Sequence, residues 1–83
     1  MGRARKTLHR MLRANSDASI GFADLCGLLR RLGFAERTRG SHHIFVKEGV
    51  AGQIVLQRDS GKAKPYQVRQ VRHIILTYRL ELD

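Results

Sequence analysis

The sequence predicts a small two-layer α+β domain in which a three-stranded antiparallel sheet packs on helices. The chain has 83 residues, which is enough for one domain with a single modest core. Apolar residues repeat at helical spacing in three segments, and short β-type runs lie between the second and third of these. Glycine-containing turns separate the runs, so we expect consecutive antiparallel strands with the helices on one face.

The first predicted helix covers residues 3–14 and is strongly basic. Leu8, Met11 and Leu12 recur at i, i+3 and i+4, and the rest of the surface carries Lys and Arg but no acidic residue. We expect either a short docking helix with a solvated face or an arm that binds phosphate groups. The second alternative requires the cations to point the same way as His42.

The second predicted helix has the most regular apolar pattern in the chain. A break at residues 15–17 precedes it, and Asp17 or Ser19 can cap it. Gly33 supplies its C-terminal stop, and basic residues occupy its last turn, where cations suit the helix dipole. Its apolar face consists of Phe22, Leu25, Leu28, Leu29 and Leu32, with Cys26 at the margin.

Three short runs with strand character follow this helix. They cover Phe34 to Arg39, His42 to Glu48 and Gln53 to Arg58. Gly40-Ser41 separates the first pair and residues 49–52 separate the second, which predicts tight antiparallel turns. A polar loop at 59–64 leads to a closing helix over about residues 65–80, where proline suits the first position. The apolar face of this helix consists of Val68, Val71, Ile75 and Tyr78, flanked by Ile74 and Leu82.

The charge balance indicates a phosphate-bearing partner, above all nucleic acid. Sixteen Lys and Arg residues against seven Asp and Glu residues give a net charge of +9. No apolar stretch approaches the roughly 20 residues that a membrane span needs, and no apolar segment follows the basic N-terminus as in a secretory signal. The lone Cys26 can form no internal disulfide, so we expect a small buried hydrophobe in a cytoplasmic protein.

The motif Gly-Ser-His-His-Ile-Phe at residues 40–45 is the best candidate for catalysis. Imidazole exchanges protons near neutral pH, because its unperturbed pKa is about 6.5, and a cationic surface suits cleavage of an anionic polymer. Side chains alternate across a strand, so burying Phe45 against the helices turns His42 outward and His43 toward the helices. A hydrogen-bonded packing role is then expected for His43. The same register turns two apolar side chains outward, Ile44 and Val46.

Three motifs together resemble those of the HicA toxins of bacterial toxin–antitoxin modules. They are Leu29-x-x-Leu32-Gly33-Phe34, Arg39-Gly40-Ser41-His42-His43-Ile44-Phe45 and the Gly61-Lys62 loop. The central motif is short, but its place between a Leu-rich helix and a meander makes the match fairly specific. The resemblance runs from about Phe22 to Tyr78.

This resemblance implies an α-β-β-β-α fold similar to a double-stranded-RNA-binding domain. Residues 1–16 would then form a basic helical extension, and residues 17–83 the HicA-like domain. The resemblance also implies a ribosome-independent mRNA interferase that inhibits translation and growth, controlled by a HicB-like antitoxin protein. The active histidine of the family directly follows Gly-Ser, which makes it His42 here. Two departures are the basic extension and Leu56-Gln57-Arg58 in place of a Pro-containing run.

The residues allow the chemistry that this resemblance implies. RNA carries its own nucleophile, the 2′-hydroxyl, so cleavage needs two proton transfers and stabilisation of charge on the phosphorane. His42 can supply one transfer, as acid or base, and His43 is the adjacent alternative. Gly40 and Ser41 shape the turn that presents these rings, and no cofactor is required. Four cations are candidates for RNA binding: Arg37, Arg39, Lys62 and Lys64.

Other sites are less well supported by the sequence. The His42-His43 pair with His73 or His9 does not match metal-ligand spacing with carboxylate or thiolate partners, so we expect no metal. Ser41 beside His42 suggests a nucleophile and base, but no acidic orienting residue stands out and strand neighbours point apart. Two lysines before a helix N-terminus form a better phosphate site, although such pairs are more often solvated surface.

Three functions therefore remain open. The first is a ribonuclease toxin neutralised by a protein partner. The second is a noncatalytic RNA-binding module with the same fold and charge, and the third is a basic assembly subunit on a protein or ribosomal RNA surface. The ribonuclease is favoured because a binding module has no need of an imidazole at this place. A small acidic protein with a DNA-binding segment, encoded beside this one, would strongly favour the toxin.

Overall fold

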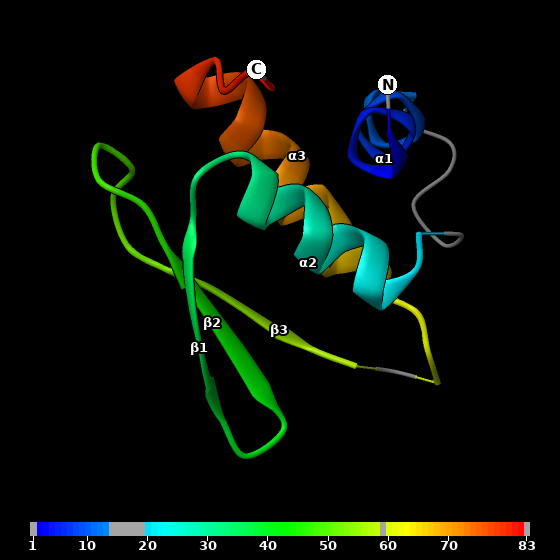
Figure 1. The fold of residues 1–83 in the computed structure, drawn as a ribbon, viewed down its shortest axis with the longest axis vertical. Coiled ribbons are helices and arrows are strands. Elements are labelled where there is room, and N and C mark those ends of the chain that lie inside the picture. Colours follow the sequence, from blue (N-terminus) through cyan, green and yellow to red (C-terminus); the bar gives the residue numbers. More distant parts are fainter. Residues whose placement is uncertain (1, 14–19, 59, 83) are drawn as a thin grey trace.

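The computed structural model describes residues 2–13, 20–58 and 60–82. Its elements are α1 (Arg3–Leu12), α2 (Phe22–Arg31), β1 (Ala35–Arg39), β2 (His42–Val46), β3 (Ile54–Gln57) and α3 (Pro65–Tyr78). This order of helices and strands confirms the predicted α+β class, with an additional helix at the N-terminal end (Figure 1). The predicted caps Asp17 and Ser19, and the predicted boundary after residue 16, lie outside the described residues.

The helices lie on one side of the sheet, and its other side is left open (Figure 1). The strand order is β1-β2-β3, and both pairs are antiparallel. Helix α1 packs against α2, with a smaller contact to α3, and therefore belongs to the helical side. Side-chain alternation and the strand register assign eight residues to what we call the open face: Ala35, Arg37, Arg39, His42, Ile44, Val46, Val55 and Gln57.

The hydrophobic core lies between the helices and the inner face of the sheet. Phe45 is fully buried there, as the alternation predicts, and this burial sets the register that turns His42 to the open face. The core draws on every helix and on two strands, with Met11, Leu25, Leu28, Phe45, Leu56, Val68 and Val71 among its fully buried members. Within the described ranges, no helix is long and apolar enough to cross a membrane.

One of the two predicted tight turns of the meander is confirmed, whereas the connection between β2 and β3 is a longer loop over residues 47–53. Arg39 pairs directly with His42, so Gly40 and Ser41 form a two-residue turn, and Gly40 adopts the left-handed conformation with φ of 61°. Strand β2 ends at Val46, two residues before its predicted end. The chain turns there, since the Val50 N–H donates to the carbonyl of Lys47 3.1 Å away.

The helix ends follow the predicted signals with one correction. Helix α2 ends before Gly33, whose φ of 98° turns the chain into β1. Helix α3 begins at Pro65 but ends at Tyr78 rather than near residue 80, because Arg79 adopts a left-handed conformation. Tyr78 was predicted on the apolar face but is 39% exposed, and its hydroxyl accepts a hydrogen bond from the Ala51 N–H at 3.2 Å.

Candidate functional site

His42 begins β2 on the open face and is exposed. Its direct neighbours across the two strand pairs are Arg39 on β1 and Gln57 on β3. The Nε2 of Gln57 donates to the hydroxyl of Ser41 at 3.3 Å, which ties the hairpin turn to the third strand. The imidazole of His42 is therefore presented at a braced strand end, with a guanidinium on the adjacent strand.

Two of the four predicted RNA-binding cations share the open face with His42. Arg37 and Arg39 are both exposed, and they stand opposite Ile44 and His42 in the strand register. Lys62 and Lys64 follow β3 and are not part of the three strands. Lys62 forms an isolated β-bridge with Gly21 just before α2, and Lys64 is the N-cap of α3.

The N-cap position of Lys64 has a local structural explanation. Its backbone N–H donates to the side-chain oxygen of the buried Gln67 at 3.3 Å, and the N–H groups of Gln67 and Val68 donate to the Lys64 carbonyl. These bonds satisfy groups that would otherwise be unpaired at the start of α3. The predicted phosphate site at Lys62 and Lys64 therefore lies at the N-terminal ends of α2 and α3.

The apolar part of the open face is smaller than predicted. Both Ile44 and Val46 point to this face, but Ile44 is only 8% exposed, whereas Val46 is 44% exposed. Ile44 lies on the central strand with Arg37 and Val55 directly opposite on either side, and such neighbours cover a central side chain. A shallow hollow of about 250 Å³ remains there, lined by Ala35, Glu36, Arg37, Ile44 and Val46.

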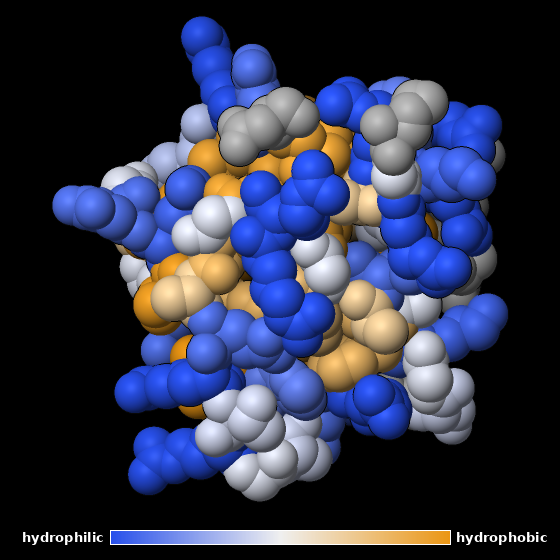
Figure 2. All heavy atoms as spheres, viewed as in Figure 1, coloured by the Kyte–Doolittle hydropathy of each residue, from blue (hydrophilic) through white to orange (hydrophobic). Residues whose placement is uncertain are grey.

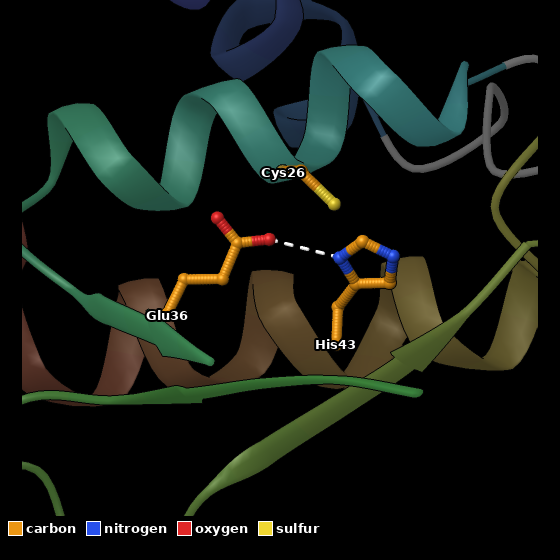
Figure 3. Close-up of side chains that lie close together, drawn as sticks. All are labelled: Cys26, Glu36 and His43. Carbon is orange, nitrogen blue, oxygen red and sulfur yellow. Dashed lines mark hydrogen bonds and ion pairs between the residues drawn. The ribbon is translucent and has the colours of Figure 1, made fainter. Parts of the chain in front are cut away.

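His43 points to the helical side, as predicted, and forms a network that links three elements (Figure 3). Its Nδ1 lies 2.9 Å from Oε2 of Glu36 on β1, and the other carboxylate oxygen accepts from Nε of Arg30 on α2 at 2.6 Å. A carboxylate only accepts hydrogen bonds, so the Nδ1 atom of His43 carries the proton. The ring also meets the edge of Phe22, with centroids 5.0 Å apart.

Burial and the charges around this network shift the pKa values of Cys26 and Glu36 in opposite directions. The hydrogen bond from Arg30 lowers the pKa of Glu36; burial opposes this shift, and the bond from His43 adds to it. Burial, and then the negative charge of Glu36, raise the pKa of the Cys26 thiol to about 11. The thiol is thus protonated at neutral pH, and Glu36 is ionised.

Cys26, Glu36 and His43 also form the one grouping of potential metal ligands among the described residues. Their ligand atoms lie within 4.8 Å of one another, and each residue type binds zinc in proteins (Figure 3). Metal binding would require a deprotonated thiol, whereas burial favours the neutral form. Both oxygens of Glu36 already accept bonds from Arg30 and His43. Glu36 and His43 therefore fit a hydrogen-bonded network with Arg30 better than a cation site, and the neutral thiol of Cys26 lies beside them.

Sequence reasoning missed Glu36 as the orienting acid of a histidine. Along the chain, no acidic residue adjoins Ser41 or His42. The signal was present in the two-residue turn at Gly40 and Ser41. This turn pairs Thr38 with His43, and so places Glu36, two residues earlier, on the same face as His43.

The basic helix α1 does not share a face with His42. It packs on α2 through its buried residues Ala4, Thr7 and Met11, and its cations are exposed. In Figure 2, hydrophilic side chains cover the region over α1. The condition set for a phosphate-binding arm beside His42 is therefore not met, and α1 docks on α2 with its cations exposed.

The comparison with protein families agrees with this fold and motif. The family described as the HicA toxin of bacterial toxin–antitoxin systems matches residues 22–77, from the start of α2 almost to the end of α3. No curated protein and no solved structure gave a significant match. The matched segment covers well over half of the chain and contains both histidines, the three strands and the two helices that pack on them. The chain therefore belongs to the HicA family, the toxins of bacterial toxin–antitoxin systems.

Proposed function

We propose that this toxin is a cytoplasmic, metal-independent endoribonuclease that cleaves mRNA and so inhibits translation and growth. A HicB-like antitoxin protein is the proposed inhibitor. One observation carries the proposal: the exposed imidazole of His42 stands directly opposite Arg39, with Arg37 on the same face. This arrangement places a proton-transfer group among cations on a face that the helices leave accessible.

The proposed reaction uses the 2′-hydroxyl of RNA as the nucleophile. This oxygen attacks the adjacent phosphorus and loses its proton, while the departing 5′-oxygen gains one. His42 performs one of these transfers, and Arg37 and Arg39 bind the phosphate and stabilise the charge of the phosphorane. The products are a 2′,3′-cyclic phosphate and a 5′-hydroxyl. General acid–base catalysis by one imidazole contributes a factor of about 10²–10⁴.

His43 is the less favoured catalytic histidine. Its ring lies between α2 and the sheet, its side chain is 27% exposed, and its Nδ1 atom is held by Glu36. These contacts support a role in fixing the hairpin against α2. With the proton on Nδ1, the Nε2 atom can accept a proton, as in a general base that a carboxylate holds in orientation. An experiment must therefore compare both histidines.

Substitution of each histidine tests the assignment. We expect His42→Ala and His42→Gln to reduce cleavage of a single-stranded RNA by about 10²–10⁴ and to relieve growth inhibition. Because His42 is exposed, the free energy of unfolding should change by less than about 0.5 kcal/mol. His43→Ala should cost about 1–2 kcal/mol of stability and retain its activity per folded molecule.

The outcomes separate the alternatives. If His42→Ala cleaves RNA at the parental rate and a folded His43→Ala variant does not cleave it, the catalytic histidine would be His43. RNA binding without cleavage by the unsubstituted protein would support a noncatalytic RNA-binding module.

The chemistry of the products is a second test. Cleavage should persist in EDTA, and 2′-O-methylation of the scissile nucleotide should abolish it, because the nucleophile is then blocked. End-group analysis should find 2′,3′-cyclic phosphate. Strict dependence on an added divalent ion would contradict the proposal. Cys26, Glu36 and His43 would then be the candidate metal ligands to substitute.

A further inference from the structure

Helix α1 presents a row of cations on the surface of the helical side. The helix lies outside the segment matched by the HicA family, so that match assigns it no role. Arg3, Lys6, Arg10 and Arg13 recur at i, i+3, i+7 and i+10, and all four are exposed. At 100° per residue they fall within about 80° of one another, beside the face that buries Ala4, Thr7 and Met11, with Arg13 at the C-cap. We call these four residues the α1 row.

The α1 row is not explained by the stability of the helix. The first turn contains no acidic residue, although the positive end of the helix dipole favours acidic groups there. Like charges three or four residues apart, such as Lys6 and Arg10, destabilise a helix by a few tenths of a kcal/mol per pair. The docking contacts through Met11 would be the same with neutral side chains on the outer surface. Apart from Arg3, whose ion pair with Asp24 joins α1 to α2, helix stability does not account for the row, and an anionic ligand would.

The surroundings of the row are also positive. A hollow of about 560 Å³ beside the helix is lined by Gly2, Arg3, Lys6, Thr7, Arg10 and Asp24. Among these lining residues Asp24 is the one carboxylate, and it is already paired with Arg3 at 3.1 Å. An adjoining hollow between α1 and α2 adds Arg31. An anionic ligand would thus meet an excess of cations along the whole length of α1.

We propose that the α1 row binds the phosphodiester backbone of a nucleic acid, at a site separate from the open face that carries His42. The row extends for about 15 Å along the helix axis. That length corresponds to about four phosphates of one duplex strand, which follow one another at about 3.4 Å. Three of its four members are arginines, whose planar guanidinium groups match phosphate oxygens in pairs.

An evenly charged polymer fits this surface better than an acidic protein does. Lys and Arg continue around the exposed side of α1 with Arg5, and the helix offers no carboxylate to pair with a basic residue of a protein partner. A protein interface also needs an apolar centre, whereas most of the apolar side of α1 is used against α2 and α3 and Leu12 is the exposed large apolar side chain of this helix. Through this second site the protein would bind a nucleic acid without engaging the open face, where cleavage is proposed.

Salt-dependent binding tests the proposal. The variant is Lys6→Gln with Arg13→Gln, two exposed members of the row. The probe is a 2′-O-methyl RNA of about 20 nucleotides, which cannot be cleaved through its 2′-position, so the result does not depend on the proposed activity. Each lost single-strand contact lowers the slope of log K against log salt by about 0.7, so the double variant should lose about 1.4. At about 0.1 M salt this corresponds to roughly 25-fold weaker binding.

The matched control is Lys47→Gln with Arg79→Gln, which removes the same charge outside α1 and outside the open face. An equal slope change in both double variants would show only a net-charge effect and would overturn the proposal. Single-stranded DNA of the same sequence shows whether the phosphates can come from DNA as well as RNA. Weaker binding of the α1 double variant to both probes, or to the RNA alone, supports the site. A loss confined to polyglutamate binding would assign the row to an acidic protein and overturn the proposal. Circular dichroism melting confirms that each variant is folded.

Discussion

The carboxylate of Glu36 connects β1 to α2 through Arg30 and to β2 through His43. Its side chain is only 17% exposed, and its pKa is lowered chiefly by the hydrogen bond from Arg30. A group with a lowered pKa in the folded state contributes stability above its usual pKa, which is about 4.3 for Glu. That contribution is lost as the pH falls through the lowered value. Part of the stability should therefore disappear in acid, below about pH 4.

We expect Glu36→Gln to reduce the free energy of unfolding at pH 7 by about 1–2 kcal/mol, because charge-assisted bonds to Arg30 and His43 are weakened. The loss of stability on acidification should also become smaller than in the parent. Denaturant unfolding across pH 3 to 7 measures both effects. Glu48→Gln, which removes an exposed carboxylate, is the matched control. Equal acid sensitivity in parent and Glu36→Gln would contradict this role.

At the scale of single residues, the sequence predicted the orientation of the two histidines better than their partners. Alternation from Phe45 was sufficient to turn His42 out and His43 in, since one face of β2 is buried. The hydrogen bond between His43 and Glu36 depends on the side-chain rotamers of two residues on neighbouring strands. Patterns of adjacent residues in the sequence do not predict it. The low exposure of Ile44 likewise depends on both flanking strands.

Among the elements, α2 has two glycines that are expected to respond to substitution in opposite ways. Gly27 lies within the helix, and an added Cβ would meet nothing within 4 Å. Gly33 follows the helix with φ of 98°, and a Cβ there would come within 2.8 Å of Nζ of Lys47. Gly27→Ala should stabilise the protein by about 0.5–1 kcal/mol, because alanine favours helix. Gly33→Ala should destabilise it by about 1–3 kcal/mol through backbone strain.

Thermal and denaturant unfolding of the two alanine variants measure this difference, and each variant is the control for the other. Similar effects of the two substitutions would mean that the conformation of Gly33 is not required for the passage from α2 into β1. Retained RNA cleavage by a folded Gly27→Ala protein would show that the helix itself does not limit activity.

Local signals predicted the type and order of all elements, and several of their ends. Gly33, the Gly40-Ser41 turn and Pro65 act through backbone conformation, which depends on few residues. The strand ends were overestimated, because pairing stops where the partner chain turns away. Tyr78 was misplaced because α3 extends past the core at its last turn, where the hydroxyl reaches the loop at Ala51.

For the whole molecule, the arrangement of charge on two opposite sides was not predictable from the sequence. The net charge of +9 indicated nucleic acid but not where it would lie. The sequence left open whether the cations of α1 join those of the open face, and the packing of α1 on α2 separates them. Lys62 and Lys64 lie at the N-terminal ends of α2 and α3 instead of on a strand, which the sequence pattern did not indicate.

This arrangement makes the open face the expected target of the antitoxin. A HicB-like partner with a negative surface would meet Arg37 and Arg39 and cover His42, and complementary charge would speed the encounter. Lasting affinity requires apolar contacts, and Val46 is the exposed apolar side chain on this face, at the edge of the shallow hollow. We expect Val46→Asp to weaken antitoxin binding by about 10-fold or more while RNA cleavage by the free toxin is retained.

Hydrogen exchange of the free and antitoxin-bound protein tests direct occlusion. Amides of β1 and of the Gly40-Ser41 turn should exchange more slowly in the complex, because the partner covers the face and edge to which they belong. Amides of α1 should exchange alike in both states, since α1 lies on the helical side. Slower exchange confined to the helices, with the sheet around His42 equally labile in both states, would mean that the antitoxin acts from the helical side. In that case Val46→Asp would leave its affinity unchanged.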